Sequence, residues 1–150
     1  MKKNILIVTA ISLFMANSVF GQDIPHHQVP SVILNNFKSD FPKASDIEWE
    51  KEGDLYKVDF EIGWNTDHEI WYEASGDVVK HKEDISKSEL PKAVSDRIHT
   101  DFDGYSIDDL KRITTASESE TIYFLELNSF TQDWEVTIDS NGKVLNQIAD

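Results

Sequence analysis

The chain contains the same pattern twice, and this repeat constrains its fold more than any other feature. Pro30 is followed eleven residues later by Phe41, and Pro91 is followed eleven residues later by Phe102. A repeat of this length indicates a duplicated supersecondary unit. We expect one unit in residues 29–79, a second in residues 90–150, and a charged linker in residues 80–89. The apolar positions coincide at a constant offset of 61: Val29, Ile33, Phe37 and Phe41 correspond to Leu90, Val94, Ile98 and Phe102.

Each unit reads as one helix followed by about four short strands. Apolar residues at i, i+4 spacing after a proline predict helices over Pro30–Asp40 and Pro91–Asp101. Alternating apolar and polar residues then predict antiparallel strands that are buried on one face, with Ile47 and Trp49 both on the inner face of the first strand. One helix covers only one face of a sheet, so the fold class is α+β with the helices on one side. The predicted strands are 46–51, 55–62, 69–73 and 78–79, then 110–115, 122–128, 134–139 and 144–148.

Residues 1–21 have the pattern of a signal peptide. A basic start is followed by an apolar run from Ile5 to Phe20, which is short for a membrane span of about 20 residues. Gly21–Gln22 is a plausible cleavage point, and the alternative is an uncleaved anchor. Residues 22–28 then form a predicted flexible leader. The chain contains no Cys for a lipid anchor, so we expect a periplasmic or secreted protein that is not inserted in the membrane after cleavage.

The charge of the chain limits the classes of partner. Its 28 acidic residues face 14 basic ones, for a net charge of −14. Such a balance argues against nucleic acid and anionic membranes as partners, and it favours cations or a basic protein. The absence of Cys excludes disulfides and thiolate chemistry. The sequence does not indicate an oligomeric state.

No motif indicates catalysis, a cofactor or a fixed metal site. Nucleophile elbows, zinc-protease motifs and phosphate loops are all missing from the sequence. The fragments Asp101–Gly104 and Asp139–Gly142 resemble parts of a calcium loop but lack its full ligand set, and Asx-Gly pairs are ordinary turn residues. The histidines lack zinc-site spacing, so we expect surface positions for His68, His81 and His99.

Strand alternation predicts an acidic outer sheet face that contains two aromatic residues. Trp71 and Phe124 are out of place there, and Trp is enriched at interface hot spots. The alternative is that Trp71 is covered by a loop, a neighbouring strand or the leader. Trp64 and Phe130 occupy equivalent hairpin loops, where they either form a binding rim or fold back onto the core. The acidic candidates for partner binding are Asp59, Glu61, Glu69, Glu73, Glu126 and Glu135.

Several segments resemble the PepSY-like family, exported bacterial proteins that are described as similar to the beta-lactamase inhibitor protein. The resemblance rests on Phe41–Pro42, Asp46–Trp49, Tyr56–Phe60, and the endings Glu73–Val79 and Asp139–Leu145. It covers most of residues 29–148, although the second unit has no Trp after its helix. The resemblance implies two tandem α+β units that form one curved sheet, and a non-catalytic role in binding or inhibiting another protein. Inhibition of a beta-lactamase would rest on analogy of fold alone.

The sequence therefore predicts an exported binding protein rather than an enzyme. We expect it to dock or inhibit a protein or peptide of basic character through the acidic sheet face. The alternative is a sensor or carrier that binds a small ligand or cation on the same face or in the hairpin loops.

Overall fold

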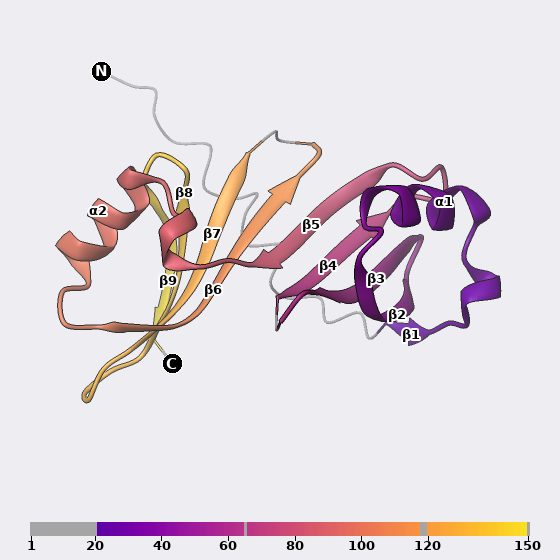
Figure 1. The fold of residues 1–150 in the computed structure, drawn as a ribbon. Helices are drawn as coiled ribbons and strands as arrows, with labels where there is room; N and C mark the ends of the chain where they lie inside the picture. The colour runs from indigo at the N-terminus through magenta and orange to yellow at the C-terminus, as the bar shows by residue number, and fades with distance from the viewer. Residues whose placement is uncertain (1–20, 65, 118–119, 150) are drawn as a thin grey trace, which may run out of the picture.

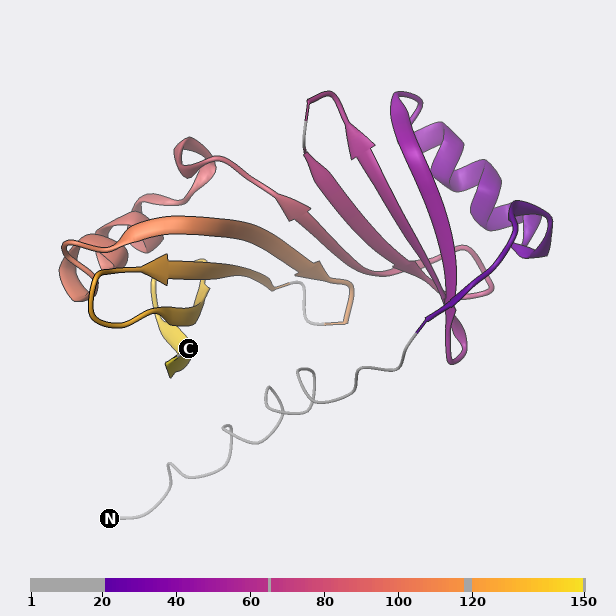
Figure 2. The same cartoon turned by 90° about the horizontal axis from the view of Figure 1, so that it is seen from below.

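The computed structural model describes residues 21–64, 66–117 and 120–149. Within them, nine strands form one sheet in which each strand pairs with its neighbours in the sequence. Two α-helices lie at opposite ends of this sheet (Figures 1 and 2). In this part of the chain, neither helix has the length and apolar composition needed to cross a membrane. The α+β class predicted from the repeat is confirmed.

The first unit contains one helix and four long strands, preceded by a short strand and a 3-10 turn. Its elements are β1 (Gln22–Asp23), η2 (His26–Gln28), α1 (Ser31–Asp40), β2 (Ala44–Glu52), β3 (Leu55–Ile62), β4 (Asp67–Tyr72) and β5 (Val78–Asp84). The second unit repeats the order of a 3-10 turn, a helix and strands. Its elements are η3 (Lys87–Glu89), α2 (Lys92–Asp101), β6 (Ser106–Thr115), β7 (Thr121–Asn128), β8 (Trp134–Asp139) and β9 (Val144–Ala149).

The repeated apolar stripe forms the inner side of each helix. Ile33 and Phe37 of α1 are buried, and Val94 is the buried residue of α2. Each helix closes on the repeated phenylalanine, whose N–H donates to the carbonyl oxygen four residues earlier, at 2.8 Å for Phe41 and 2.9 Å for Phe102. Pro42 then prevents α1 from continuing because a proline ring clashes with the preceding turn.

Each helix packs on its own hydrophobic core. In the first core the Phe37 ring meets the edges of Trp49 and Phe60, with centroid distances of 5.4 and 4.9 Å. The second core has its own buried set and packs beneath α2. The buried members of the first core are Val29, Ile33, Phe37, Trp49, Val58, Phe60, Ile70 and Tyr72, and those of the second are Val94, Phe102, Leu110, Tyr123, Leu125, Leu127, Val136 and Ile138.

Both cores lie on the same face of the sheet. Strand register places Val58 beside Ile70 and Leu110 beside Leu125. Between them, Glu83 of β5 pairs with Arg112 of β6, and both belong to this same face by alternation. The sheet therefore has a helix face, which carries both cores, and an open face on the other side.

The strand β5 extends further than the sequence predicts. The expected linker 80–89 begins inside it, because Lys80–Asp84 pairs with Lys111–Thr115 of β6. These charged residues suit a strand because their partners on β6 include Arg112 opposite Glu83 and Lys111 opposite Asp84. The two units consequently share one continuous sheet.

Two details near the N-terminal edge also differ from the predicted pattern. Ile47 is exposed rather than inward, because a bulge between Ser45 and Glu48 shifts the register and Asp46 adopts a φ of 50°. Residues 22–28, the predicted flexible leader, contain β1, which pairs with Glu50 and Lys51, and η2. The expected signal peptide covers residues 1–21, and residues 1–20 lie outside the described part of the chain.

The β8–β9 turn should be the tightest point of contact between a hairpin and a helix. Gly142 has a φ of 81°, and a Cβ there would collide with the carbonyl oxygen of Ala93 in α2. Gly104 has a similar φ of 85° but has nothing within 4 Å of an added Cβ. We expect Gly104→Ala to lower the free energy of unfolding by about 1–2 kcal/mol through backbone strain. Gly142→Ala should lower it by a further ~1–3 kcal/mol because the backbone of α2 must move. Urea denaturation of both variants checks this, and equal losses would contradict the close packing of this turn.

Candidate functional site

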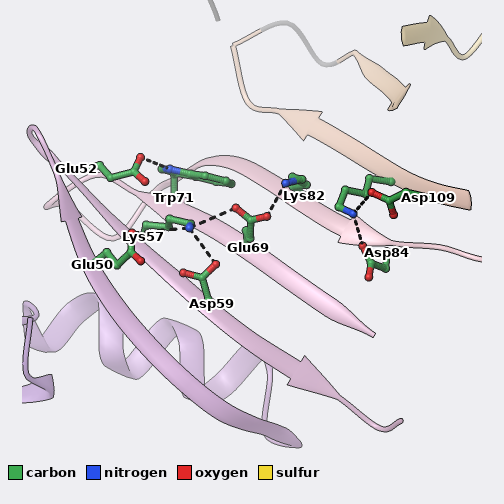
Figure 3. A network of polar contacts seen from close by, with 10 residues as sticks. Glu50, Glu52, Lys57, Asp59, Glu69, Trp71, Lys82, Asp84 and Asp109 are labelled. Atoms are coloured by element: carbon green, nitrogen blue, oxygen red, sulfur yellow. Dashed lines mark hydrogen bonds and ion pairs between the residues drawn. The ribbon is translucent and has the colours of Figure 1, made fainter. Parts of the chain in front are cut away.

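Strand alternation predicted an acidic open face. The structure shows that four lysines lie on this face among the acidic residues. Lys57 Nζ lies 3.0 Å from Asp59 Oδ1, 3.4 Å from Glu69 Oε2 and 3.8 Å from Glu50 Oε2, and Lys82 Nζ lies 2.6 Å from Glu69 Oε1 (Figure 3). The contact with Asp59 lies within β3, and the others join opposite charges on neighbouring strands from β2 to β5. The four lysines are Lys57, Lys80, Lys82 and Lys111.

This network changes the acidity of its members. Burial works to lower the pKa of Lys57, but the hydrogen bond to Asp59 and the surrounding carboxylates raise it overall. Burial works to raise the pKa of Glu69, but the hydrogen bond and charge of Lys82 lower it overall. Burial raises the pKa of Asp59 against the opposing effect of Lys57. The first unit's part of the open face is therefore largely neutralised by its own side chains.

Trp71 lies on the open face as predicted, but its exposed fraction is only 7%. The ammonium of Lys80 lies 3.5 Å from the ring centroid and that of Lys57 lies 5.6 Å away. The indole Nε1 donates a hydrogen bond of 2.8 Å to Glu52 Oε2. Neighbouring strands thus cover the ring through cation–π contacts and lysine stems, which is the alternative that the sequence left open.

The two hairpin-loop aromatics are the most exposed large apolar side chains of the described chain. Trp64, between β3 and β4, is 97% exposed, and Phe130, between β7 and β8, is fully exposed. The alternative that they fold back over the core is therefore wrong. Both loops lie at the same end of the antiparallel strands, with β5 and β6 between the two hairpins. Neighbouring strands of a sheet rotate by about 20–25° relative to one another, so the two loops are further apart than the spacing of the strands alone would place them.

A pair of carboxylates faces across the strands near the loop that carries each of these aromatics. Glu61 pairs with Asp67 at the last position of the β3–β4 ladder before the Trp64 loop, and Glu126 pairs with Glu135 one position before the end of the β7–β8 ladder, whose loop carries Phe130. Among the described residues, none of these four carboxylates forms an ion pair. Like charges directly opposite each other destabilise a sheet. Each hairpin therefore has an exposed aromatic ring in its loop and, near the loop end of its ladder, two facing carboxylates that form no ion pair among the described residues.

At the end of the second unit, neighbouring carboxylates change the acidity of Glu126. Partial burial and the carboxylates of Asp109 and Glu135 raise the pKa of Glu126. Phe124 is half-buried beside them and pairs in register with Lys111, whose ammonium contacts Asp84 at 3.3 Å and also Asp109. The sequence placed Phe124, Glu126 and Glu135 together on the open face, and the structure brings them to one end of it.

The loop that presents Phe130 is held by its own hydrogen bonds. The Ser129 N–H donates to Asp133 Oδ1 at 2.9 Å, and the Ser129 hydroxyl donates to the carbonyl oxygen of Gln132 at 2.7 Å. The N–H groups of Thr131 and Gln132 donate back to Ser129 Oγ at 3.3 and 3.1 Å. Phe130 therefore stands on an ordered turn rather than on a loosely held one.

Two further acidic residues serve turns. Glu73 is exposed in the β4–β5 turn, and its N–H donates to the carbonyl oxygen of Asp77 at 2.9 Å. The carboxylate of Asp139 accepts from the N–H groups of Asn141 and Lys143 at 2.9 and 3.0 Å. The calcium-like fragment Asp139–Gly142 is thus an Asx-type turn whose carboxylate is already used by the backbone.

One cluster on the helix face was missed by the sequence prediction. His68 is 6% exposed, so its predicted surface position is wrong, and it stacks on Phe60 with a centroid distance of 5.0 Å. His68 Nδ1 lies 3.1 Å from His81 Nε2 and 3.7 Å from Glu83 Oε2. Thirteen residues separate the two histidines, and only the β4–β5 pairing brings them together. We call His68, His81 and Glu83 the histidine cluster.

The two tryptophans of the first unit should respond differently to truncation. We expect Trp71→Ala to lower the free energy of unfolding by about 3 kcal/mol, because it removes a buried ring and leaves Glu52 without its donor. Trp64→Ala should change it by no more than about 0.5 kcal/mol because the ring is almost fully exposed. Urea denaturation followed by circular dichroism measures both, and a large loss for Trp64→Ala would mean that its ring packs on the protein.

Comparisons with known proteins agree with this architecture. The family model described as "Putative beta-lactamase-inhibitor-like, PepSY-like" matches residues 18–67 and 55–146. No curated protein sequence matches the chain. The chain is similar to a BLIP-like protein from Bacteroides fragilis, with a TM-score of 0.64, 19% identity, and coverage of 79% of this chain and 84% of that chain. It is also similar to a structure from Bacteroides eggerthii described as "putative periplasmic proteins", with a TM-score of 0.67, 19% identity, and coverage of 81% and 88%.

At these identities the structural matches show a common fold. The family model, by contrast, matches the sequence itself from residue 18 to residue 146 in two overlapping segments. The helices and strands of both units fall within these segments, except for the last three residues of β9. The chain therefore belongs to the beta-lactamase-inhibitor-like, PepSY-like family.

Proposed function

We propose that this protein is an exported, non-catalytic binding protein that docks a protein partner through its open face and the hairpin ends beside it. The observation that carries this proposal is that each of the two equivalent hairpins has an exposed aromatic ring in its loop and, near the loop end of its ladder, two facing carboxylates without an ion pair in the described chain. These are Trp64 with Glu61 and Asp67, and Phe130 with Glu126 and Glu135. Unpaired like charges destabilise the free protein, so their presence at both equivalent ends favours a role in binding.

The docking surface is centred on the hairpin ends rather than on the middle of the open face. Trp71, Asp59 and Glu69 already have partners within the chain, so a docking protein would have to compete for them. Trp64 and Phe130 contribute large apolar area with few rotatable bonds, and such residues are frequent anchors of interfaces. Phe124 extends the apolar surface inward from the Phe130 end.

The partner presents basic groups near apolar pockets. A lysine or arginine of the partner would relieve the repulsion between Glu126 and Glu135, and that between Glu61 and Asp67. The net charge of −14 would also steer a basic partner toward the chain. Two anchors in separate hairpins, with β5 and β6 between them, fit a folded protein better than a small ligand.

Family membership supports the non-catalytic role and export. The family description refers to inhibition of another protein, and one similar structure is described as periplasmic. The apolar stretch at the start of the chain would direct export, and cleavage after Gly21 would leave Gln22 as the first residue.

The double variant Trp64→Ser/Phe130→Ser tests the proposal. We expect crosslinking of purified Gln22–Asp150 in envelope extract to capture a saturable protein partner, and the double variant to lose it. The matched control is Val32→Ser, which alters an exposed apolar residue of α1 on the helix side. The proposal is supported if Val32→Ser still captures the partner and the double variant does not. Equal capture by all three proteins, with each still folded by circular dichroism, would contradict it.

Removal of the Glu135 carboxylate should have opposite effects on stability and on partner binding. We expect Glu135→Gln to raise the free energy of unfolding by roughly 0.2–1 kcal/mol, because it removes the repulsion with Glu126. The same substitution should weaken binding of the captured partner and reduce the dependence of binding on salt. Urea denaturation and surface plasmon resonance at two ionic strengths measure these effects. Unchanged affinity together with increased stability would mean that the carboxylate pair does not take part in docking.

A further inference from the structure

The middle of the helix face has polar residues where the two cores leave a gap. In Figure 1, α1 and α2 lie at opposite ends of the sheet and β5 and β6 run between them without a helix above them. The histidine cluster lies at this place, on β4 and β5, and Arg112 of β6 is next to it. His81 and Glu83 are half-buried, so an ion from solvent can reach them.

The spacing of the cluster matches the spacing of ligands around a small metal ion. Two nitrogen ligands about 2.0–2.1 Å from a four-coordinate zinc ion are about 3.4 Å apart. His68 Nδ1 and His81 Nε2 are 3.1 Å apart, and Glu83 Oε2 is 3.7 Å from His68 Nδ1. One ligand atom from each of the three residues lies within 4.8 Å of the other two. Small side-chain rotations are enough to place all three around one ion.

The surroundings hold these ligands in the required orientation. The His68 ring stacks on Phe60 with an interplanar angle of 13°, and Phe41 packs edge-on to the His81 ring at 5.9 Å. Arg112 Nε donates to Glu83 Oε1 at 2.8 Å, which fixes the carboxylate and leaves Oε2 directed at His68. A hydrogen bond to the second oxygen of a ligating carboxylate is typical of metal sites.

Protonation also suits metal binding. Burial lowers the pKa of His68 against the opposing effect of Glu83, Asp84 and Asp67, and burial lowers the pKa of His81 as well. Both shifts favour the neutral imidazole, which is the form that binds metals. Without metal, one of the two facing nitrogens carries a proton and donates it to the other. Metal binding requires that this ring change its tautomer and that both rings rotate so that their nitrogens point to one ion.

We propose that His68, His81 and Glu83 form a binding site for a divalent transition-metal ion of the zinc class, with one coordination position left open. Two imidazoles and one carboxylate suit zinc, copper or nickel rather than calcium or magnesium. The site joins β4 to β5, the strand that connects the two units, so metal binding stabilises this junction. It lies on the helix face, so it is independent of the proposed docking surface.

Zinc binding to the purified chain tests the site. The adjacent His26 and His27 are exposed and could bind metal weakly, so the experiment uses the His26→Asn/His27→Asn protein as its reference. We expect calorimetric titration with ZnCl2 to give one ion per chain, and thermal unfolding to show a saturable rise in Tm. With Co2+ as a spectroscopic probe, one equivalent should produce the stronger visible absorption of a four-coordinate site.

The substitution His81→Gln in this reference should weaken zinc binding by about tenfold or more and remove the rise in Tm. The matched control is His99→Gln, which alters an exposed histidine of α2 and should leave both unchanged. Glu83→Gln provides a second variant that keeps the shape of the side chain, in case His81→Gln alters folding. Absence of zinc binding to the reference protein, or unchanged zinc affinity in folded His81→Gln and Glu83→Gln, would overturn the proposal.

Discussion

The pairing of β5 with β6 is the interaction on which the shape of the whole molecule depends. Five residue pairs join Lys80–Asp84 to Lys111–Thr115 and merge two helix-plus-strands units into one nine-stranded sheet. Opposite charges face each other in this ladder, Glu83 with Arg112 and Asp84 with Lys111. A segment that reads as a charged linker can thus form a strand, because Lys82, Glu83 and Asp84 find opposite charges on the neighbouring strands and Lys80 covers Trp71. Without this ladder, each unit would leave a strand edge exposed.

The open face shows how the same acidic composition gives two different surfaces. In the first unit, Lys57 and Lys82 neutralise the carboxylates around them, and Lys80 covers Trp71. At the hairpin ends, the carboxylates of Glu61 and Glu135 face other carboxylates and have no such partner among the described residues. The first arrangement stabilises the sheet, whereas the second leaves charge and apolar area available to another molecule. For this reason we place the proposed docking surface at the hairpin ends.

The two faces of the sheet offer different chemistry to ligands. Exposed rings and unpaired carboxylates at the open side suit a large basic partner, and both hairpin tips have equivalent places in the repeat. The histidine cluster on the helix face has no equivalent position in the second unit, where β8 and β9 carry no histidine. It arises at the junction of the units, at the edge of the first core, and it couples a proposed metal site to the ladder that joins them.

The sequence by itself determined the duplication, the two helices, the inner face of most strands and the turns that contain glycine. These features depend on periodicity and local turn chemistry, which a single segment of chain contains in full. The sequence also placed Trp64 and Phe130 in equivalent loops. It could not decide whether their rings fold back onto the core. Tertiary structure alone decided the burial of Trp71 beneath Lys80, the exposure of Ile47 at a bulge, and the meeting of His68 with His81. Each of these depends on strand register, and register joins residues that are distant in sequence and carry no local signal of their pairing.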